Sequence, residues 1–312
     1  MPKQNTHLAI FFMVLAAVSF ATMGALVKAS TGHLPFLVAV LFRNVISVIP
    51  LIIYFRVKGL SFRVNNRKLM FARSTFGFSA MFLYFLAIEY LPLSLAVVLN
   101  SSSPVFVVIM SGLILRERDV GKLIPLVVLA LVGVAWLVFG RQSPEAGAKP
   151  FSIGIALLGL LSAVLAAAAY VAVRKLSATE PSARIVLHFG LWSSFYSVVA
   201  LVIAVVAGYE KLEPAVIWDV ISTPKSLLML IGVGLAGLGG QMFMTAAYAR
   251  ERASIVSGFS YLNPVFAYFI GLLVFGEPLT VSGIGGGLLV LGASLGLTIM
   301  AEHNSTVPKP SP

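Results

Sequence analysis

The chain has no cysteine, and charged residues make up only 11% of its 312 residues. The lack of cysteine excludes thiol catalysis, zinc sites with cysteine ligands and disulfide-stabilised folds. Soluble domains contain about 25% charged and about 45–50% apolar residues. Here 59% of the residues are hydrophobic, which excludes an ordinary water-soluble enzyme and a disordered protein. The composition therefore indicates an integral membrane protein.

Ten stretches of the sequence approach the length of about 20 apolar residues that a helix needs to cross a bilayer. The first is longer than the apolar region of a signal peptide, so we expect it to be a span of the mature protein. The sequence thus predicts an all-α integral membrane protein with ten transmembrane helices. They cover residues 8–27, 34–55, 69–88, 93–115, 121–139, 151–173, 185–207, 226–248, 253–275 and 279–301.

Lysine and arginine are distributed unevenly between the two sides of this topology. Sixteen of the 22 fall on the side that holds both termini, five fall on the other side, and Arg43 lies inside a span. The positive-inside rule predicts that both termini are cytoplasmic. We expect a multi-pass protein of the cell membrane, which is the inner membrane if the source is a Gram-negative bacterium. The net charge of +11 follows from this topology, so the expected partners are lipid and a small-molecule substrate, not nucleic acid.

The two halves of the sequence resemble each other. Residues 85–133 align with residues 245–293 at a constant offset of 160, without a gap. A shared Pro-Val-Phe and a glutamate thirteen residues beyond each proline make a chance match improbable. The paired residues include Ser94 with Ser254, Pro104-Val105-Phe106 with Pro264-Val265-Phe266, Leu113 with Leu273, and Glu117 with Glu277.

This repeat predicts two five-helix halves. The first covers residues 1–139, a linker covers 140–150, the second half covers 151–301, and a cytoplasmic tail covers 302–312. An odd number of spans per half inverts one half relative to the other, and such inverted repeats are characteristic of secondary transporters. We therefore expect transport by alternating access rather than catalysis.

Two segments of the sequence are similar to a known transporter family. The stretch LPLSLAVVLNSSSPVFVVIMSGLILRER and its echo RERASIVSGFSYLNPVFAYFIGLLVFGEP resemble the EamA-type transporters of the drug/metabolite transporter superfamily. The resemblance covers residues 8–301 and implies a transporter fold without cofactor or metal. It specifies the substrate poorly, because the family includes exporters and importers of amino acids, nucleotide-like metabolites, vitamins and drugs. The first half departs from the pattern, with Arg116-Glu117-Arg118 in place of Gly276-Glu277-Pro278.

Pro104 and Pro264 lie at the centres of the fourth and ninth spans. Each lacks an N–H and clashes with the carbonyl four residues back, which belongs to Asn100 or Ser260. We expect two helix kinks whose free carbonyls line a cavity, since irregular backbone within a membrane normally does so. The alternative is a purely structural kink that nearby serines or a neighbouring helix repair.

Polar and aromatic side chains near these kinks are the candidate substrate-binding residues. For the serines the alternative role is hydrogen bonding between helices. We expect the third, fourth, eighth and ninth spans to provide most of the lining. The candidates are Ser79, Tyr84, Asn100, Ser101, Trp192, Gln241, Ser260, Tyr261 and Asn263, together with Arg43.

Arg43 lies about 13 Å from either end of its span at 1.5 Å per residue. An arginine at that depth costs several kcal/mol unless it faces water or a partner. It is either a cation that attracts a substrate carboxylate or phosphate, or a structural residue bonded to kinked-helix carbonyls. No acidic residue lies in the central two turns of any span. We therefore expect an anionic or zwitterionic metabolite, such as an amino acid or its derivative, rather than a cationic drug.

Arg73 and His188 lie about one turn inside the cytoplasmic end of their spans. Interfacial anchoring is the expected role of both, and His188 is also a candidate proton carrier. A competing hypothesis is an intramembrane serine hydrolase, because Gly258-Phe259-Ser260-Tyr261 has the GxSx form and His188 would serve as its base. That chemistry needs a hydrogen bond of about 3 Å between the two, whereas their predicted depths differ by about two turns. Another alternative is an exporter of drug-like compounds.

Two GxxxG pairs in the tenth span predict close helix packing. They are Gly283 with Gly287 and Gly292 with Gly296. This packing occurs either within the bundle or between protomers, so both a monomer and a homodimer are expected alternatives.

Overall fold

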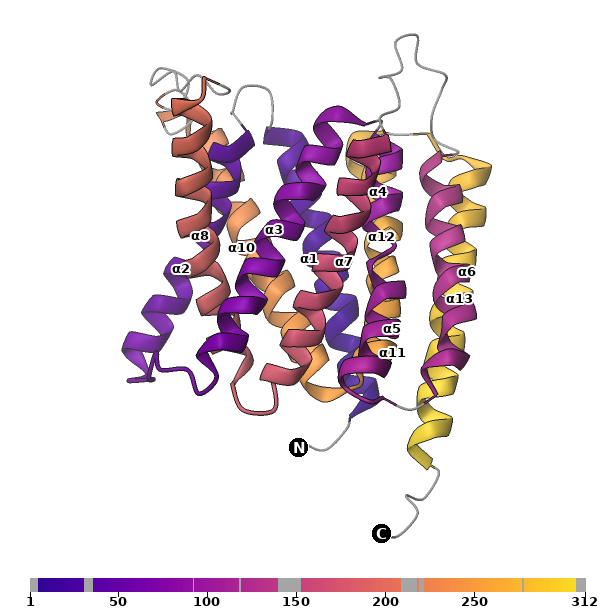
Figure 1. Ribbon diagram of the computed structural model, residues 1–312. Coiled ribbons are helices and arrows are strands. Elements are labelled where there is room, and N and C mark those ends of the chain that lie inside the picture. Colours follow the sequence, from indigo (N-terminus) through magenta and orange to yellow (C-terminus); the bar gives the residue numbers. More distant parts are fainter. Residues whose placement is uncertain are drawn as a thin grey trace.

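The computed structural model describes residues 5–30, 36–91, 93–117, 119–139, 153–208, 218, 222–276 and 278–306. Within these ranges the regular elements are all helices, which run side by side in one bundle (Figure 1). The first half contributes α1 (Thr6–Ser30), α2 (Phe36–Val57), α3 (Arg67–Tyr90), α4 (Leu93–Asn100), α5 (Ser103–Ile114) and α6 (Val120–Phe139). The second contributes α7 (Ile153–Leu176), α8 (Ser182–Val206), α10 (Pro224–Arg250), α11 (Ala253–Gly258), the 3₁₀ turn η1 (Phe259–Tyr261), α12 (Leu262–Phe275) and α13 (Val281–Thr306).

Among the described residues, nine helical stretches are long and apolar enough to cross a membrane. They occupy nine of the ten expected spans. The remaining expected span, residues 69–88, falls within α3, which has 24 residues. At 1.5 Å per residue, a helix of that length is long enough to cross the roughly 30 Å hydrocarbon core. The linker 140–150 and the tail beyond residue 306 lie outside the described residues.

Large apolar side chains cover the outside of the bundle. Leu113, Val202 and Leu295 are examples on three different helices, each more than half exposed. Contiguous exposed apolar surface of this extent is a liability in water. In lipid it costs nothing, because the surrounding hydrocarbon chains are as apolar as these side chains. The fold is therefore that of a multi-pass membrane protein.

Both spans that contain a central proline are interrupted rather than merely kinked. The helix α4 ends at Asn100 and α5 begins at Ser103, while η1 separates α11 from α12. Each proline follows its interruption in the first turn of the next helix, where its missing N–H costs no helical hydrogen bond. The hydroxyl of Ser102 donates to the carbonyl of Leu99 at 2.6 Å, so side chains satisfy part of the broken backbone.

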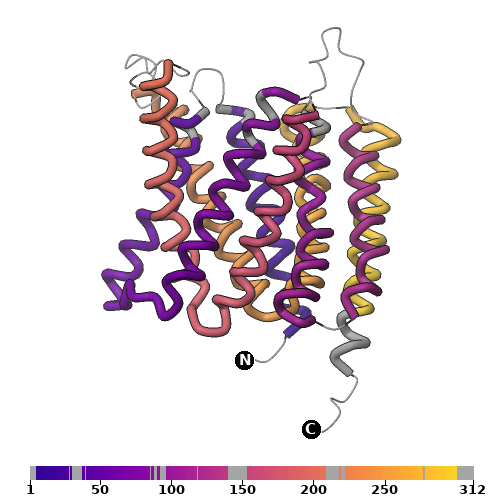
Figure 2. Tube along the Cα trace, in the orientation of Figure 1, coloured from indigo at the N-terminus to yellow at the C-terminus, as the bar shows by residue number. Residues whose placement is uncertain are grey.

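Helices from the two expected halves pack against each other throughout the bundle. The helix α1 packs against α10 and α12, α3 against α7 and α8, and α6 against α13. Figure 1 shows the α6–α13 pair at one side of the bundle and α2 with α8 at the other. Figure 2 shows that α1 starts at the same end of the bundle toward which α13 runs.

A close approach of two glycines holds α6 against α13. A Cβ atom added to Gly286 would lie 2.4 Å from the carbonyl oxygen of Gly133 and 2.7 Å from the backbone nitrogen of Leu137. In each GxxxG pair, one glycine packs closely and the other does not. Gly283 packs on Tyr268 and Gly296 on Leu126, whereas a Cβ atom added to Gly287 or Gly292 would have nothing within 4 Å. Gly283, Gly286 and Gly296 thus serve packing within the bundle.

Gly286→Ala is expected to lower the melting temperature of the purified protein clearly below that of Gly287→Ala. Both changes gain the same helix propensity. Only the first forces a methyl group into a backbone carbonyl, and overpacking costs about 1–3 kcal/mol. Thermal unfolding in one detergent measures the difference. Equal melting temperatures would show that α6 and α13 are free to separate.

Candidate functional site

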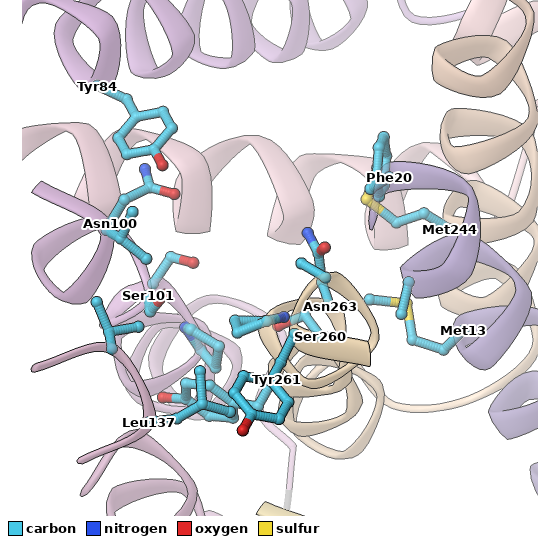
Figure 3. A pocket seen from close by; sticks show the side chains of 18 of the residues that line it. Met13, Phe20, Tyr84, Asn100, Ser101, Leu137, Met244, Ser260, Tyr261 and Asn263 are labelled. Atoms are coloured by element: carbon cyan, nitrogen blue, oxygen red, sulfur yellow. The ribbon is translucent and has the colours of Figure 1, made fainter. Parts of the chain in front are cut away.

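A cavity of about 580 Å³ lies where the two interrupted spans meet. This volume is within the range of about 300–1,000 Å³ that is usual for small-molecule sites. Figure 3 shows residues from the α4–α5 break, the α11–α12 break, α1 and α10 around it. The lining consists of Met13, Ala17, Phe20, Tyr84, Val97, Asn100, Ser101, Ser103, Pro104, Leu137, Val138, Tyr170, Met244, Ser260, Tyr261, Asn263, Pro264, Ala267 and Tyr268.

Equivalent positions of the two halves line this cavity together. Within the aligned stretches 85–133 and 245–293, four pairs of lining residues are related by the offset of 160. The cavity is therefore built from the same part of each half, at the points where the backbone leaves regular helical geometry. The pairs are Asn100 with Ser260, Ser101 with Tyr261, Ser103 with Asn263, and Pro104 with Pro264.

The polar groups of the lining are held from within the bundle. The amide of Asn100 donates to the Ser162 hydroxyl of α7 at 3.1 Å, and that hydroxyl donates to the carbonyl of Gly159 at 2.6 Å. The Tyr261 hydroxyl is buried and has no hydrogen-bond partner among the described residues. A buried hydroxyl without a partner is costly, so it is a group that a ligand or water would satisfy.

The expected lining was incomplete in one respect. Residues of α1, α6 and α7 face the cavity as well, among them Met13, Phe20, Leu137 and Tyr170. Three of them are apolar residues within apolar helices, so no sequence signal distinguishes them from lipid-facing residues. Tyr170 alone carries a signal, because it is a polar aromatic residue that ends a run of four alanines.

Four of the candidate binding residues are not among the residues that line this cavity: Arg43, Ser79, Trp192 and Gln241. Trp192 instead stacks on Tyr196, with ring centroids 5.7 Å apart, and meets Phe71 edge-on at 5.1 Å. Because Phe71 is exposed on the outside of the bundle, this aromatic cluster belongs to the outer surface of α3 and α8.

The serine and histidine of the hydrolase hypothesis bind other groups. The hydroxyl of Ser260 donates to the carbonyl of Ser257 at 2.6 Å. The Nε2 of His188 lies 2.8 Å from the carbonyl oxygen of Phe62, in the segment between α2 and α3. Within the described ranges no hydrogen bond joins Ser260 to His188, so the arrangement that activates a serine nucleophile is not formed.

Arg43 lies inside the bundle among weak acceptors. Its Nε is 3.3 Å from the sulfur of Met23. Its Nη1 is 3.2 Å from the sulfur of Met81 and 3.4 Å from the side-chain oxygen of Asn44. Among the residues the structure describes, no carboxylate forms an ion pair with it. Thioethers are weak acceptors, so this guanidinium retains a strong capacity to bind an anion.

Arg73 is not an interfacial anchor, contrary to expectation. Its side chain is only 2% exposed, its Nη2 donates to Gln241 Oε1 at 3.0 Å, and its Cζ lies 3.7 Å above the centre of the Phe189 ring. Its Nε and Nη1 have no hydrogen-bond partner in the described structure. The part of the bundle that the structure describes thus holds a buried arginine, Arg73, in addition to the partly buried Arg43.

Contacts between the halves gather at the end of the bundle where α1 begins. Glu117, beyond α5, accepts hydrogen bonds from the backbone nitrogens of Ala253 at 2.8 Å and Ser254 at 3.1 Å, and from the Ser254 hydroxyl. Glu251 accepts a hydrogen bond from the Thr6 hydroxyl of α1. Glu277, which matches Glu117 in the repeat, lies outside the described residues. No group of three or more metal-ligating side chains occurs in the part of the chain that the structure describes.

Cysteines at positions 100 and 263 are expected to react with a water-soluble maleimide, because both native asparagines face the cavity. The native chain has no cysteine, so no background needs to be removed. Ala163, which is fully buried on α7, provides a matched position whose cysteine should stay unreactive. Labelling followed by mass shift measures the rates. Inert cysteines at both 100 and 263 would contradict access from water to the cavity.

The sequence matches a known transporter family and individual proteins. The EamA-like transporter family matches the chain twice, over residues 7–139 and 153–299. The pseudopaline exporter CntI of Pseudomonas aeruginosa is 31% identical over 296 residues, which cover 93% of this chain and 95% of the exporter. Solute carrier family 35 member G1 of Mus musculus is 30% identical over 304 residues, covering 94% of this chain and 78% of that protein.

A solved structure shares the fold. It superimposes with a TM-score of 0.78 at 17% sequence identity and covers 97% of this chain and all of its own. At this identity the likeness shows the arrangement of the helices alone.

Proposed function

This chain belongs to the EamA-like transporter family, and on that premise we propose that it carries a small organic metabolite across the membrane by alternating access of the cavity. The observation that carries the proposal is the cavity itself. Equivalent residues of both halves line it, and both halves leave helical geometry there. A site between two equivalent halves is the arrangement in which their relative movement exposes it to either side.

The proposed topology has ten spans, with α3 as the third, and two inverted halves at residues 1–139 and 151–301. The two family matches support the division. The excess of lysine and arginine on the side of the termini supports a cytoplasmic position for both. The expected location is the cell membrane.

Alkaline phosphatase fused after residue 306 is expected to be inactive in bacteria, and green fluorescent protein at the same position is expected to be bright. The phosphatase needs the oxidising outer compartment to form its disulfides. A phosphatase fused in the linker after residue 145 provides the matched control and should be active. An active fusion after residue 306 would require an odd number of spans or the reverse orientation.

We propose an anionic or zwitterionic substrate, with an amino acid or its derivative ahead of a cationic drug. The support is electrostatic. Arg43 is a deep cation whose acceptors are two thioethers and an amide, and a substrate carboxylate would meet it in a region of low dielectric. The relative from Pseudomonas aeruginosa is an exporter by name, so outward movement is the first direction to test.

Proteoliposomes test this function directly. Vesicles loaded with unlabelled glutamate, alanine, succinate or choline are placed in the matching radiolabelled compound, and exchange is measured against protein-free vesicles. We expect exchange of an anionic or zwitterionic compound and none of choline. Exchange of choline alone would contradict the substrate class. Exchange of none of the four would count against this class of small metabolites.

A further inference from the structure

The buried Arg73 and the partly buried Arg43 contact neighbouring positions on the same two helices. Both arginines contact α3. Nη1 of Arg73 lies 3.0 Å from the position that a Cβ atom would occupy at Gly77, and Nη1 of Arg43 lies 3.2 Å from the sulfur of Met81. Positions 77 and 81 share one face of a helix, one turn or about 6 Å apart. The two guanidiniums therefore contact positions that are one turn apart on the same face of α3.

The opposing helix gives the same spacing independently. Both arginines also contact α10. Nε of Arg43 lies 3.2 Å from the position that a Cβ atom would occupy at Gly237, and Nη2 of Arg73 lies 3.0 Å from Oε1 of Gln241. Positions 237 and 241 are again one turn apart. Gly77 and Gly237 lie outside the aligned stretches but are also 160 residues apart, and at both of them the absent side chain leaves space beside a guanidinium.

Two like charges at this spacing repel each other in a region of low dielectric, and each also loses its hydration. The groups that contact the two arginines in the described structure do not compensate for this repulsion and this loss of hydration. Gln241 and Phe189 contact Arg73, and the partners of Arg43 are neutral. Two nitrogens of Arg73, Nε and Nη1, are buried without a partner. Within the described ranges no carboxylate neutralises either arginine, so the unpartnered nitrogens of Arg73 remain able to bind an anion.

Tyr170 connects the arginine pair to the cavity. It lines the cavity, and it lies within electrostatic range of both Arg43 and Arg73. Gln241 is on α10, one turn before Met244 and Thr245, and Met244 also lines the cavity. Tyr170 and α10 thus contribute both to the cavity and to the surroundings of the two arginines.

We propose that Arg43, Arg73 and Gln241 form a subsite for a dianionic group, so that the substrate carries either two carboxylates or a phosphate. This deepens the function proposed above and rests on it. One guanidinium suffices for a single carboxylate, whereas two guanidiniums that contact positions a turn apart match two negative charges on one small molecule. Arg73 is thus a specificity-determining residue that discriminates dianions from monoanions.

The test compares succinate with succinamate, which has nearly the same shape but carries an amide in place of one carboxylate. Isothermal titration of the purified full chain in detergent measures both dissociation constants, and inorganic phosphate serves as the phosphate probe. We expect wild type to bind succinate or phosphate at least about tenfold more tightly than succinamate, because hydrogen bonds between charged groups are about twice as strong as neutral ones.

Arg73→Gln should reduce this discrimination to less than about twofold, because it weakens the binding of succinate and of phosphate more than that of succinamate. Arg250→Gln is the matched control and should retain it, because Arg250 ends α10 over the ring of Phe12, away from the pair. Tighter binding of phosphate than of succinate assigns the site to a phosphate group, and the reverse assigns it to a dicarboxylate.

Two results overturn the proposal. In the first, wild type binds succinate and succinamate with equal affinity and does not bind phosphate tightly. In the second, it shows saturable binding of none of the three compounds. The wild-type comparison decides even if Arg73→Gln does not fold. Failure of the proposed function has a different signature: dianions bind with discrimination, but proteoliposomes exchange none of the compounds tested.

Discussion

Replacing Arg43 by lysine is expected to reduce exchange in proteoliposomes by about 10- to 100-fold, while the protein still reaches the membrane and elutes as a folded species. The guanidinium presents a planar fork that binds a carboxylate through two parallel hydrogen bonds, which an ammonium does not reproduce. A hydrogen bond to a charged group contributes about 1.5–3 kcal/mol, and every 1.4 kcal/mol is tenfold in affinity. The positive charge stays, so the change tests geometry rather than charge alone.

Arg250→Lys is the control for this experiment. Its guanidinium donates to the carbonyl of Ala246 within the same helix at 2.8 Å and packs on Phe12. The same substitution there should leave exchange within about twofold of wild type. Normal exchange by a folded Arg43→Lys would exclude a carboxylate contact at Arg43. Loss of folding would make Arg43 a structural residue and leave the substrate's charge to the binding measurements.

The parts of the site that sequence reasoning located are those where the backbone departs from a helix. Asn100, Ser101, Ser260 and Asn263 were found because a proline at the centre of an apolar span forces an interruption next to it. The interruption then turns nearby polar groups inward, since lipid cannot hydrogen-bond them. The repeat made the inference stronger, because the same signal occurs twice.

The residues that sequence reasoning missed are placed by packing between distant helices. Arg73 is only six residues after the start of α3, which suggests a position near the interface. Phe189 of α8 and Gln241 of α10 nevertheless cover it. Trp192 was expected inside because it is a large aromatic residue in a span, yet it packs on the outer surface of α3. Periodicity is nearly absent in helices that are apolar on all sides, so their orientation depends on their neighbours.

Glu117→Gln is expected to open the end of the bundle where α1 begins. The carboxylate of Glu117 accepts three hydrogen bonds from Ala253 and Ser254, and it thereby joins the end of α5 to the start of α11 in the other half. Such a contact between the proposed halves stabilises only the conformation in which this end is closed. An amide of the same size keeps one acceptor and loses the charge, which weakens the contact by about 1.5–3 kcal/mol.

A loss of that size shifts a two-state equilibrium by about 10- to 100-fold toward the open conformation. The measurement uses Asn263→Cys as background and a membrane-impermeant maleimide applied from the side of the termini. We expect Glu117→Gln to raise the labelling rate at least about fivefold over that of the background protein. The expected increase in rate is smaller than the shift of the equilibrium, because the open conformation of the background protein is already partly populated. Asp119→Asn is the matched control, because Asp119 forms an exposed pair with Lys122 of the same segment.

Ser254→Ala separates a role in gating from simple capping of α11. It removes one of the three hydrogen bonds that Glu117 accepts and leaves the two backbone donors in place. Its labelling rate should therefore fall between those of Glu117→Gln and the control. That order follows from the number of inter-half hydrogen bonds lost. If Glu117→Gln labels no faster than Asp119→Asn, the contact has equal free energy in both conformations, and the closed end depends on Thr6 and Glu251 instead.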